Sequence, residues 1–233
     1  MRSILLFTYS ILAILILVLP NFGCESAAKE RTKKGNIAIQ YYVRYLQEKQ
    51  QVKATISFSE LDSLKKNKPK PMTEVLFQSK ALSGKKNKDT FLYQYSNNED
   101  FANDYIFQYQ LEDQLFSLPK VKLNPITDFS VEGGKVSKTL GTTLTFQSAR
   151  LQPNEQLLVF FNDVYNKTAT VTFNDLAEEK TVDIRSEQLL SLTVGKGTLY
   201  LVRQQSLQEA DDSNQFLGRT EFYTKVKNIE IVD

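Results

Sequence analysis

The chain has 233 residues, of which 41% are hydrophobic and 24% charged, and its formal net charge is +2. It contains no histidine and a single cysteine. These counts exclude Ser-His and Cys-His nucleophiles, an internal disulfide, and nearly every zinc, copper or haem site, because those sites need imidazole or several thiolates.

An apolar run near the N-terminus predicts a signal peptide over residues 1–23. Residues 4–19 are almost wholly apolar, and one cation, Arg2, precedes them. A positive residue, an apolar run and a small residue at the cut are the layout of a secretory signal. A helix of this length reaches only ~24 Å, short of the ~30 Å hydrocarbon core of a bilayer, and Pro20 ends the run.

The only cysteine, Cys24, directly follows this run, and Gly23 precedes it. The pair resembles the lipobox of bacterial lipoproteins, a likeness that covers residues 1–24 only. Asn21 and Phe22 stand where the family usually has Leu and a small residue. The resemblance implies that the sulfur of Cys24 is acylated, that the leader is cut before it, and that the mature chain is lipid-anchored in a bacterial cell envelope, facing the periplasm or the surface.

The alternative is a chance cysteine at the end of an ordinary signal peptide or of an uncleaved anchor. Lipidation accounts better for a lone cysteine, because an exported protein usually avoids a free, oxidisable thiol. Several acyl chains, at ~0.8 kcal/mol per buried methylene, anchor a protein stably where one chain is marginal. We therefore expect residues 24–36 to be a lipidated cysteine followed by a flexible, polar tether.

The charge is unevenly distributed along the chain. Residues 29–90 hold 15 Lys and Arg against 6 Asp and Glu, whereas residues 91–233 hold 13 against 20. Much of the basic excess falls in two lysine-rich segments, 65–70 and 85–88, which we predict to be loops. Solvated turns that protect strand edges are one interpretation, and attraction to anionic lipid or an acidic polysaccharide is the other.

From residue 37 onward, apolar residues recur with a period of two, which predicts strands rather than helices. The first half contains six predicted strands: residues 37–45, 52–58, 73–79, 90–96, 105–111 and 114–118. Pro119 and Pro125 bracket a short segment, and we place a domain boundary there. Residues 37–124 are thus predicted to form an N-terminal β-sandwich domain.

The second half has strand lengths and spacings typical of an immunoglobulin-like sandwich. Seven strands are predicted there: residues 142–148, 156–162, 168–174, 181–184, 189–194, 198–205 and 219–232. Gly195 and Gly197 are predicted to form a tight turn, and a change of parity predicts a bulge near Asn228. The predicted fold class is all-β, with two Ig-like antiparallel β-sandwich domains, 37–124 and 125–233. One continuous sandwich is the alternative.

Motifs that carry chemistry are weak. Three Ser-x-x-Lys pairs, beginning at Ser26, Ser63 and Ser83, lie in the tether or in lysine-rich loops and lack the partner motifs of known enzymes. Acidic neighbours such as Glu178 and Glu179 fall in polar turns, whereas a glycosidase needs two carboxylates ~5–9.5 Å apart in a cleft. We expect no catalytic residue, no metal ion and no cofactor.

Four tyrosines are the candidate ligand-binding residues. Tyr93 and Tyr95 share one face of a predicted strand, and Tyr105 and Tyr109 share one face of another, so the two strands could pair into an aromatic sheet. An exposed aromatic face would stack sugar rings, and a buried one would be core. The absence of tryptophan and the mixture of Tyr with Phe favour core.

These observations predict a non-enzymatic envelope lipoprotein that acts as a structural or binding module. Its expected partners are the membrane, through Cys24, and an envelope protein or an anionic glycan. Nucleic acid is not expected, because export removes the chain from it. A glycan- or polymer-binding accessory protein that uses the four tyrosines is the alternative, and a carboxylate-dependent hydrolase is less favoured.

Overall fold

A computed structural model of the chain describes residues 37–61, 67–87, 90–111, 113–148, 150–174, 176, 181–211 and 214–233. The predicted signal peptide, Cys24 and the tether lie outside the described residues. The described segments belong to one compact unit, Gly35–Asp233.

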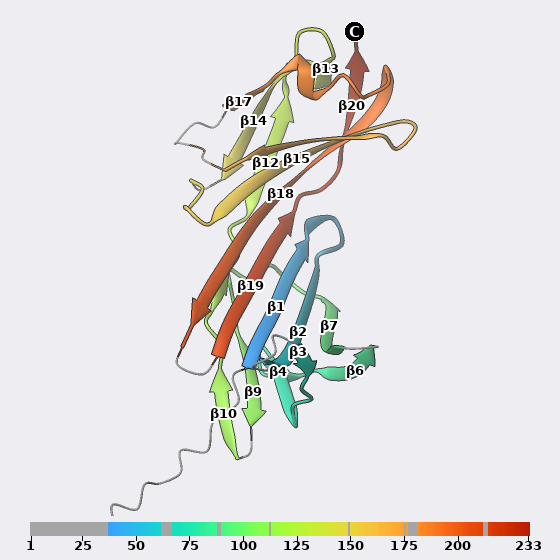
Figure 1. The fold of residues 1–233 in the computed structure, drawn as a ribbon. Coiled ribbons are helices and arrows are strands. Elements are labelled where there is room, and N and C mark those ends of the chain that lie inside the picture. The colour runs from blue at the N-terminus through green and yellow to red at the C-terminus, as the bar shows by residue number, and fades with distance from the viewer. Residues whose placement is uncertain are drawn as a thin grey trace, which may run out of the picture. The chain divides into compact units, whose positions relative to one another are not determined.

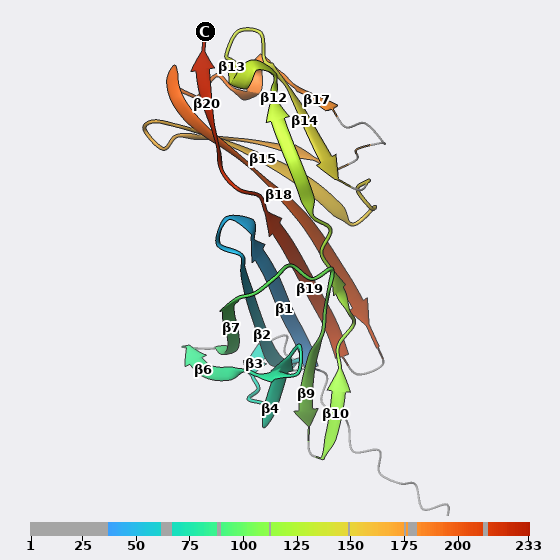
Figure 2. The same ribbon diagram turned by 180° about the vertical axis from the view of Figure 1, so that it is seen from behind.

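The described chain consists of strands and short 3-10 turns (Figures 1 and 2), so the prediction of an all-β fold is confirmed. None of its helical segments has the length and hydrophobicity needed to span a membrane. The elements in the first half are β1 (Ile37–Leu46), η1 (Gln47–Lys49), β2 (Gln51–Leu61), β3 (Asn67–Pro69), β4 (Glu74–Phe77), β5 (Lys80–Ala81), β6 (Ser83–Asn87), β7 (Thr90–Asn98), β8 (Asp104–Tyr105), β9 (Phe107–Leu111), β10 (Gln114–Ser117) and β11 (Val121–Lys122). Those in the second half are β12 (Ile126–Val131), η2 (Glu132–Gly134), β13 (Lys135–Ser137), β14 (Thr142–Ser148), β15 (Glu155–Asp163), β16 (Thr168–Phe173), β17 (Thr181–Ile184), η3 (Ser186–Gln188), β18 (Gly195–Ala210), β19 (Asn214–Tyr223) and β20 (Lys227–Val232).

The largest sheet is built around β18, a strand of 16 residues. Its order is β13-β20-β18-β19-β1-β2-β7-β6, with β15 beside β18, β16 beside β15, and β3 beside β2. β18 pairs with β20 over residues 195–199, with β19 over residues 202–210 and with β15 over residues 197–205, so it joins all three strands in one sheet. Most pairs are antiparallel as predicted, but β1–β19 and β13–β20 are parallel.

Two smaller sheets supply the opposing layers, β10-β9-β4-β5 and β12-β14-β17. Their inward side chains join those of the large sheet in one hydrophobic cluster. Between the layers, the rings of Phe58 and Tyr109 lie 5.2 Å apart, and those of Tyr41 and Phe107 lie 5.6 Å apart. Offset aromatic contacts of this kind add to the free energy gained from burial.

Strand pairing crosses the predicted boundary between residues 124 and 125. All of β1 pairs with β19, and the connector beside the boundary is tied to the same sheet. The hydroxyl of Thr220 donates to the carbonyl oxygen of Lys122 at 2.8 Å, and β11 pairs with β8. The division into domains 37–124 and 125–233 stays a prediction, but the chain is hydrogen-bonded across it.

Two strand predictions in the second half are wrong. Residues 189–194 form turns, in which the backbone amide of Leu192 donates to the carbonyl oxygen of Leu189 at 3.0 Å. The turn places these two leucines, three residues apart, in the core. The predicted strand 219–232 is interrupted between β19 and β20 rather than bulged at Asn228. Thr224 sits in the gap, and its hydroxyl accepts a hydrogen bond from the amide of Leu201 at 2.9 Å.

The glycine and lysine segments also differ from their predictions. Gly195 and Gly197 lie inside β18 and not at a turn. Lys85 and Lys86 lie in β6, which pairs with β7, and Asn67–Pro69 form β3 beside β2. β6 is the last strand of its sheet, and lysines on such an edge discourage pairing with another chain.

Candidate ligand-binding face

Three of the four candidate tyrosines belong to the core. Tyr93, Tyr105 and Tyr109 are buried, so the expectation that they face solvent under the glycan-binding alternative is wrong. Tyr95 is half-buried, and its hydroxyl donates a hydrogen bond to the carboxylate of Glu99. The predicted pairing of the two aromatic strands is wrong. β7 pairs with β2 and β6, whereas the predicted strand 105–111 divides into β8, which pairs with β11, and β9, which pairs with β4 and β10.

The two aromatic rows therefore meet between layers instead of side by side within one sheet. Phe77 of β4 lies 5.2 Å from Tyr95 and 5.7 Å from Tyr105, measured between ring centroids. The buried hydroxyl of Tyr93 donates to the carbonyl oxygen of Met72 at 2.7 Å and accepts from the amide of Met72 at 2.6 Å. Both polar capacities of this phenol are used internally, as a core position requires.

The other side of the large sheet, which faces away from this core, is not covered in this way. Along β1 the buried positions alternate with more exposed ones, so Gln40, Tyr42 and Arg44 point away from the core. We call this side of β18, β19, β1, β2 and β7 the open face. It carries a groove of about 690 Å³ whose lining comes from all five strands, and those strands lie next to one another in the sheet (Figures 1 and 2).

Most of the residues that line the groove on the open face have polar, uncharged side chains, and the rest include two arginines, one acid and two leucines. On the open face the lining comprises Gln40, Tyr42, Arg44, Thr55, Ser57, Leu92, Ser206, Gln208, Leu217, Arg219 and Glu221. Alternation puts the lining residues of β19 at odd positions, opposite the buried Thr220 and Phe222. Hydroxyl and amide side chains on such a surface can both donate and accept hydrogen bonds.

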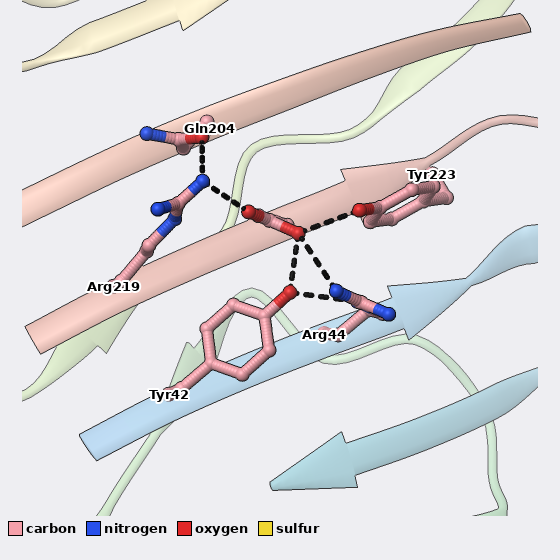
Figure 3. A network of polar contacts seen from close by, with 6 residues as sticks. Tyr42, Arg44, Gln204, Arg219 and Tyr223 are labelled. Atoms are coloured by element: carbon pink, nitrogen blue, oxygen red, sulfur yellow. Dashed lines mark hydrogen bonds and ion pairs between the residues drawn. The ribbon is translucent and has the colours of Figure 1, made fainter. Parts of the chain in front are cut away.

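Glu221 organises one wall of the groove (Figure 3). Its side chain is only 6% exposed, and its Oε1 lies 2.7 Å from a guanidinium nitrogen of Arg219. Its Oε2 accepts hydrogen bonds from the hydroxyls of Tyr42 and Tyr223, the latter at 2.8 Å, and lies 3.4 Å from Arg44. A carboxylate with this many donors is satisfied despite its burial.

Two further contacts extend this network across three strands. The Nε of Arg44 donates to the hydroxyl of Tyr42 at 2.6 Å, so that hydroxyl is both donor and acceptor. Arg219 also donates to the side-chain oxygen of Gln204 on β18. The strand register explains why these side chains lie together, because Arg44 of β1 and Gln204 of β18 are the partners on either side of Glu221 of β19.

The network shifts the acidity of its two phenols. Burial, followed by the hydrogen bond to Glu221, raises the pKa of Tyr223 to about 12. The same causes in the same order raise the pKa of Tyr42, and the neighbouring Arg44 partly opposes the rise. Both phenols are therefore protonated donors at neutral pH.

An aromatic row borders the groove on the same face. Phe160 of β15 stacks on Tyr200 of β18 with ring centroids 4.8 Å apart and planes at 9°. Tyr200 in turn lies 6.4 Å from Tyr223 at 21°, and the guanidinium carbon of Arg44 lies 4.8 Å above the ring of Tyr223. These cation-π and stacking contacts fix the side chains in place before any ligand arrives.

The acidic residues considered from the sequence do not converge on the groove. Glu178 and Glu179 lie outside the described residues, and Glu99 is bound by Lys80 and Tyr95. Glu221 is the one carboxylate among the lining residues, whereas acid-base hydrolysis of a glycoside uses a pair. Within the described ranges, no three Asp, Glu, His or Cys side chains group into a possible metal site.

The residues of the open face were not identified from the sequence. Tyr42 and Arg44 could be placed on the polar side of a strand by alternation alone, and so could Arg219 and Glu221. Their meeting depends on the parallel pairing of β1 with β19, two segments more than 170 residues apart in the chain. No local signal in either segment specifies that pairing.

No protein-family model matches the sequence, and no curated protein matches it. Among solved structures, a tetra-tandem repeat from the extending region of a large adhesion protein is 13% identical, with a TM-score of 0.29 over 82% of this chain and 48% of that one. The Yersinia pseudotuberculosis adhesin InvE is 7% identical, with a TM-score of 0.26 over 84% of this chain and 60% of that one. The chain thus spans about half the length of the first and three fifths of the second. The all-β assignment stands on the strands of this chain itself.

Proposed function

We propose that this chain is a binding module of a bacterial cell envelope, tethered to the membrane through lipidated Cys24, and that the groove of the open face is its ligand site. The leader and the lone cysteine support the anchoring. Binding rather than catalysis is supported by the polar network in the groove wall, where a single carboxylate is already paired with two arginines.

One observation carries the proposal: the side chains in the wall of the groove hold one another in place. Glu221 holds Tyr42, Arg44, Arg219 and Tyr223 through hydrogen bonds and ion pairs. Side chains that are already fixed lose little conformational freedom on binding, so more of the contact energy becomes affinity. A surface that served only to be solvated would have no need of this order.

Anchoring is tested by replacing Cys24 with Ser in the full chain and fractionating cells. The Cys24→Ser protein should move from the membrane to the soluble fraction. A variant that stays with the membrane would show that an uncleaved leader, and not acylation, holds the protein. Mass spectrometry of the mature N-terminus would confirm the acyl groups directly.

Binding at the groove is tested by site-specific photo-crosslinking in intact cells. Benzoylphenylalanine replaces Gln40, which lines the groove, or Thr170, an exposed residue of β16 outside it. We expect a discrete adduct from position 40 and none from position 170. No adduct at position 40, or equal adducts at both positions, would contradict the assignment of the groove as a binding site.

A further inference from the structure

We propose that the ligand of the groove is a linear anionic polysaccharide, whose acid groups are bound by the cations of the open face and whose hydroxyls are bound by its neutral side chains. This inference rests on the proposed function, since it names the ligand class of the same site.

The charge on the open face is one-sided. Among its described positions, together with those of the adjoining β6, there are five cations, Arg44, Lys53, Lys85, Lys196 and Arg219, and one carboxylate, Glu221. Lys53 lies opposite Arg44 in the β1–β2 register. Lys85 lies opposite Leu92, which lines the groove, in the β6–β7 register.

The single carboxylate does not cancel the cations. It is buried, whereas the side chains of Arg219 and Arg44 are 52% and 36% exposed. Each guanidinium has five N–H donors in a planar fork, and the contacts to Glu221, Tyr42 and Gln204 use only part of them. The exposed edges can therefore bind a second anion, in the two-point geometry that guanidinium forms with carboxylate.

The neutral lining favours a hydroxyl-rich ligand over an apolar or peptide one. Gln40, Thr55, Ser57, Ser206 and Gln208 each supply a group that pairs with sugar hydroxyls. The groove crosses five neighbouring strands, or ~19 Å at the usual strand spacing, which suits an extended chain of several sugar rings. An acidic polypeptide would satisfy the cations, but it offers these hydroxyl and amide groups only one backbone donor and one backbone acceptor per residue, whereas each hydroxyl of a sugar ring both donates and accepts.

The aromatic row does not serve stacking of neutral sugars. The faces of Phe160, Tyr200 and Tyr223 are turned toward one another and toward Arg44, so they are already covered. Recognition therefore falls to charge and hydrogen bonding. The presence of acid groups on the polysaccharide becomes the decisive property.

The test compares two forms of one polymer. The full chain in non-ionic detergent is titrated calorimetrically with polygalacturonate and with its fully methyl-esterified form, which keeps the sugar backbone and removes the charge. We expect polygalacturonate to bind at least 10-fold more tightly, and its affinity to fall as NaCl is raised from about 50 mM to about 300 mM. Equal binding of the two forms would overturn the proposal.

Matched lysine variants place the interaction on the open face. The double variant Lys53→Gln, Lys85→Gln leaves the Glu221 network untouched and should weaken polygalacturonate binding roughly 3- to 20-fold. The control Lys120→Gln, Lys167→Gln removes the same charge from exposed positions outside the groove lining and should have no effect. Equal weakening by both pairs would overturn the proposal, because the attraction would then be non-specific.

Poly-L-glutamate distinguishes a polysaccharide from an acidic polypeptide. It should bind more weakly than polygalacturonate, and tighter binding of the polypeptide would overturn the ligand class. These results are separable from the photo-crosslinking result. An adduct at Gln40 together with indifference to the charge of the polymer would remove the anionic polysaccharide and leave the binding site standing.

Discussion

Glu155 and Arg203 form a buried ion pair that holds the connector between the two halves of the chain, and its removal gives the sharpest test of the fold. Both side chains are 1% exposed. The Oε1 of Glu155 accepts a hydrogen bond from the side-chain amide of Asn124 at 2.7 Å, and its Oε2 accepts one from the backbone N–H of Gln152 at 2.8 Å. Arg203 donates to Glu155 and, at 2.9 Å, to the carbonyl oxygen of Arg150.

The change Glu155→Gln keeps the shape of this side chain and removes its charge. Arg203 is then a buried cation without its counter-ion, and at least one of the three donors to position 155 faces an NH2 group instead of an oxygen. Removing one partner of a buried ion pair costs about 3–5 kcal/mol. At a urea dependence of about 2–3 kcal/mol per molar, this corresponds to a midpoint lowered by about 1–2.5 M.

The assay is urea unfolding of the full chain at neutral pH, followed by far-UV circular dichroism and tyrosine fluorescence. A second variant, Glu155→Gln with Arg203→Met, removes both charges at similar volume and should recover at least half of the loss. The reasoning is refuted if Glu155→Gln costs less than about 1 kcal/mol, or if the double variant is no more stable than the single one.

Three further predictions concern separate features. Gly197→Ala should cost about 1–3 kcal/mol in urea unfolding, because a Cβ there would lie 2.7 Å from the backbone oxygen of Asn162; an unchanged midpoint would contradict this packing. Burial disfavours ionisation of Asp163, but hydrogen bonds from backbone N–H groups outweigh this effect and lower the pKa of its carboxyl group. The ionised carboxylate therefore stabilises the folded chain above about pH 4, the pKa in the unfolded chain, and this stabilisation is lost as the pH falls through the lower pKa of the folded chain. Asp163→Asn should therefore destabilise the chain at pH 7 and progressively less below about pH 4, in urea midpoints measured across that range. Glu221→Gln should lower the pKa of Tyr223 from about 12, as measured by alkaline ultraviolet titration of wild type and variant, and no change would remove Glu221 as a cause.

Alternation along single strands was predictable, and it located several elements well. The predicted strands 142–148 and 181–184 coincide with β14 and β17. In β16 the alanine and valine positions are buried and the three threonines are exposed, as the pattern indicated. A period of two depends only on neighbouring residues and on which face meets the core, so it survives without knowledge of the partner strand.

Features that depend on a partner strand were not predictable. Gly197 had the sequence appearance of a turn residue, but it lies in β18. Glycine is needed there because Ile231 and the backbone of Asn162 leave no room for a Cβ. The strand therefore runs through the predicted turn to a length of 16 residues. Tyr93 and Tyr95 share one face of β7 as predicted, whereas Tyr105 lies in β8 and Tyr109 in β9, and only the arrangement of the sheets decided that Tyr93, Tyr105 and Tyr109 are buried.

The open face joins the binding proposal to the way the fold is closed. Tyr42 and Arg44 come from β1, which follows the predicted tether, whereas Arg219, Glu221 and Tyr223 come from β19, near the end of the chain. These two strands pair in parallel, so the Glu221 network links side chains across the seam, by which we mean the β1–β19 pairing of two segments that are far apart in the sequence.

A ligand that contacts both arginines must strengthen the seam between β1 and β19, because it binds the paired strands and not the separated ones. At a ligand concentration 100 times the dissociation constant this linkage adds about 2.7 kcal/mol to the free energy of unfolding.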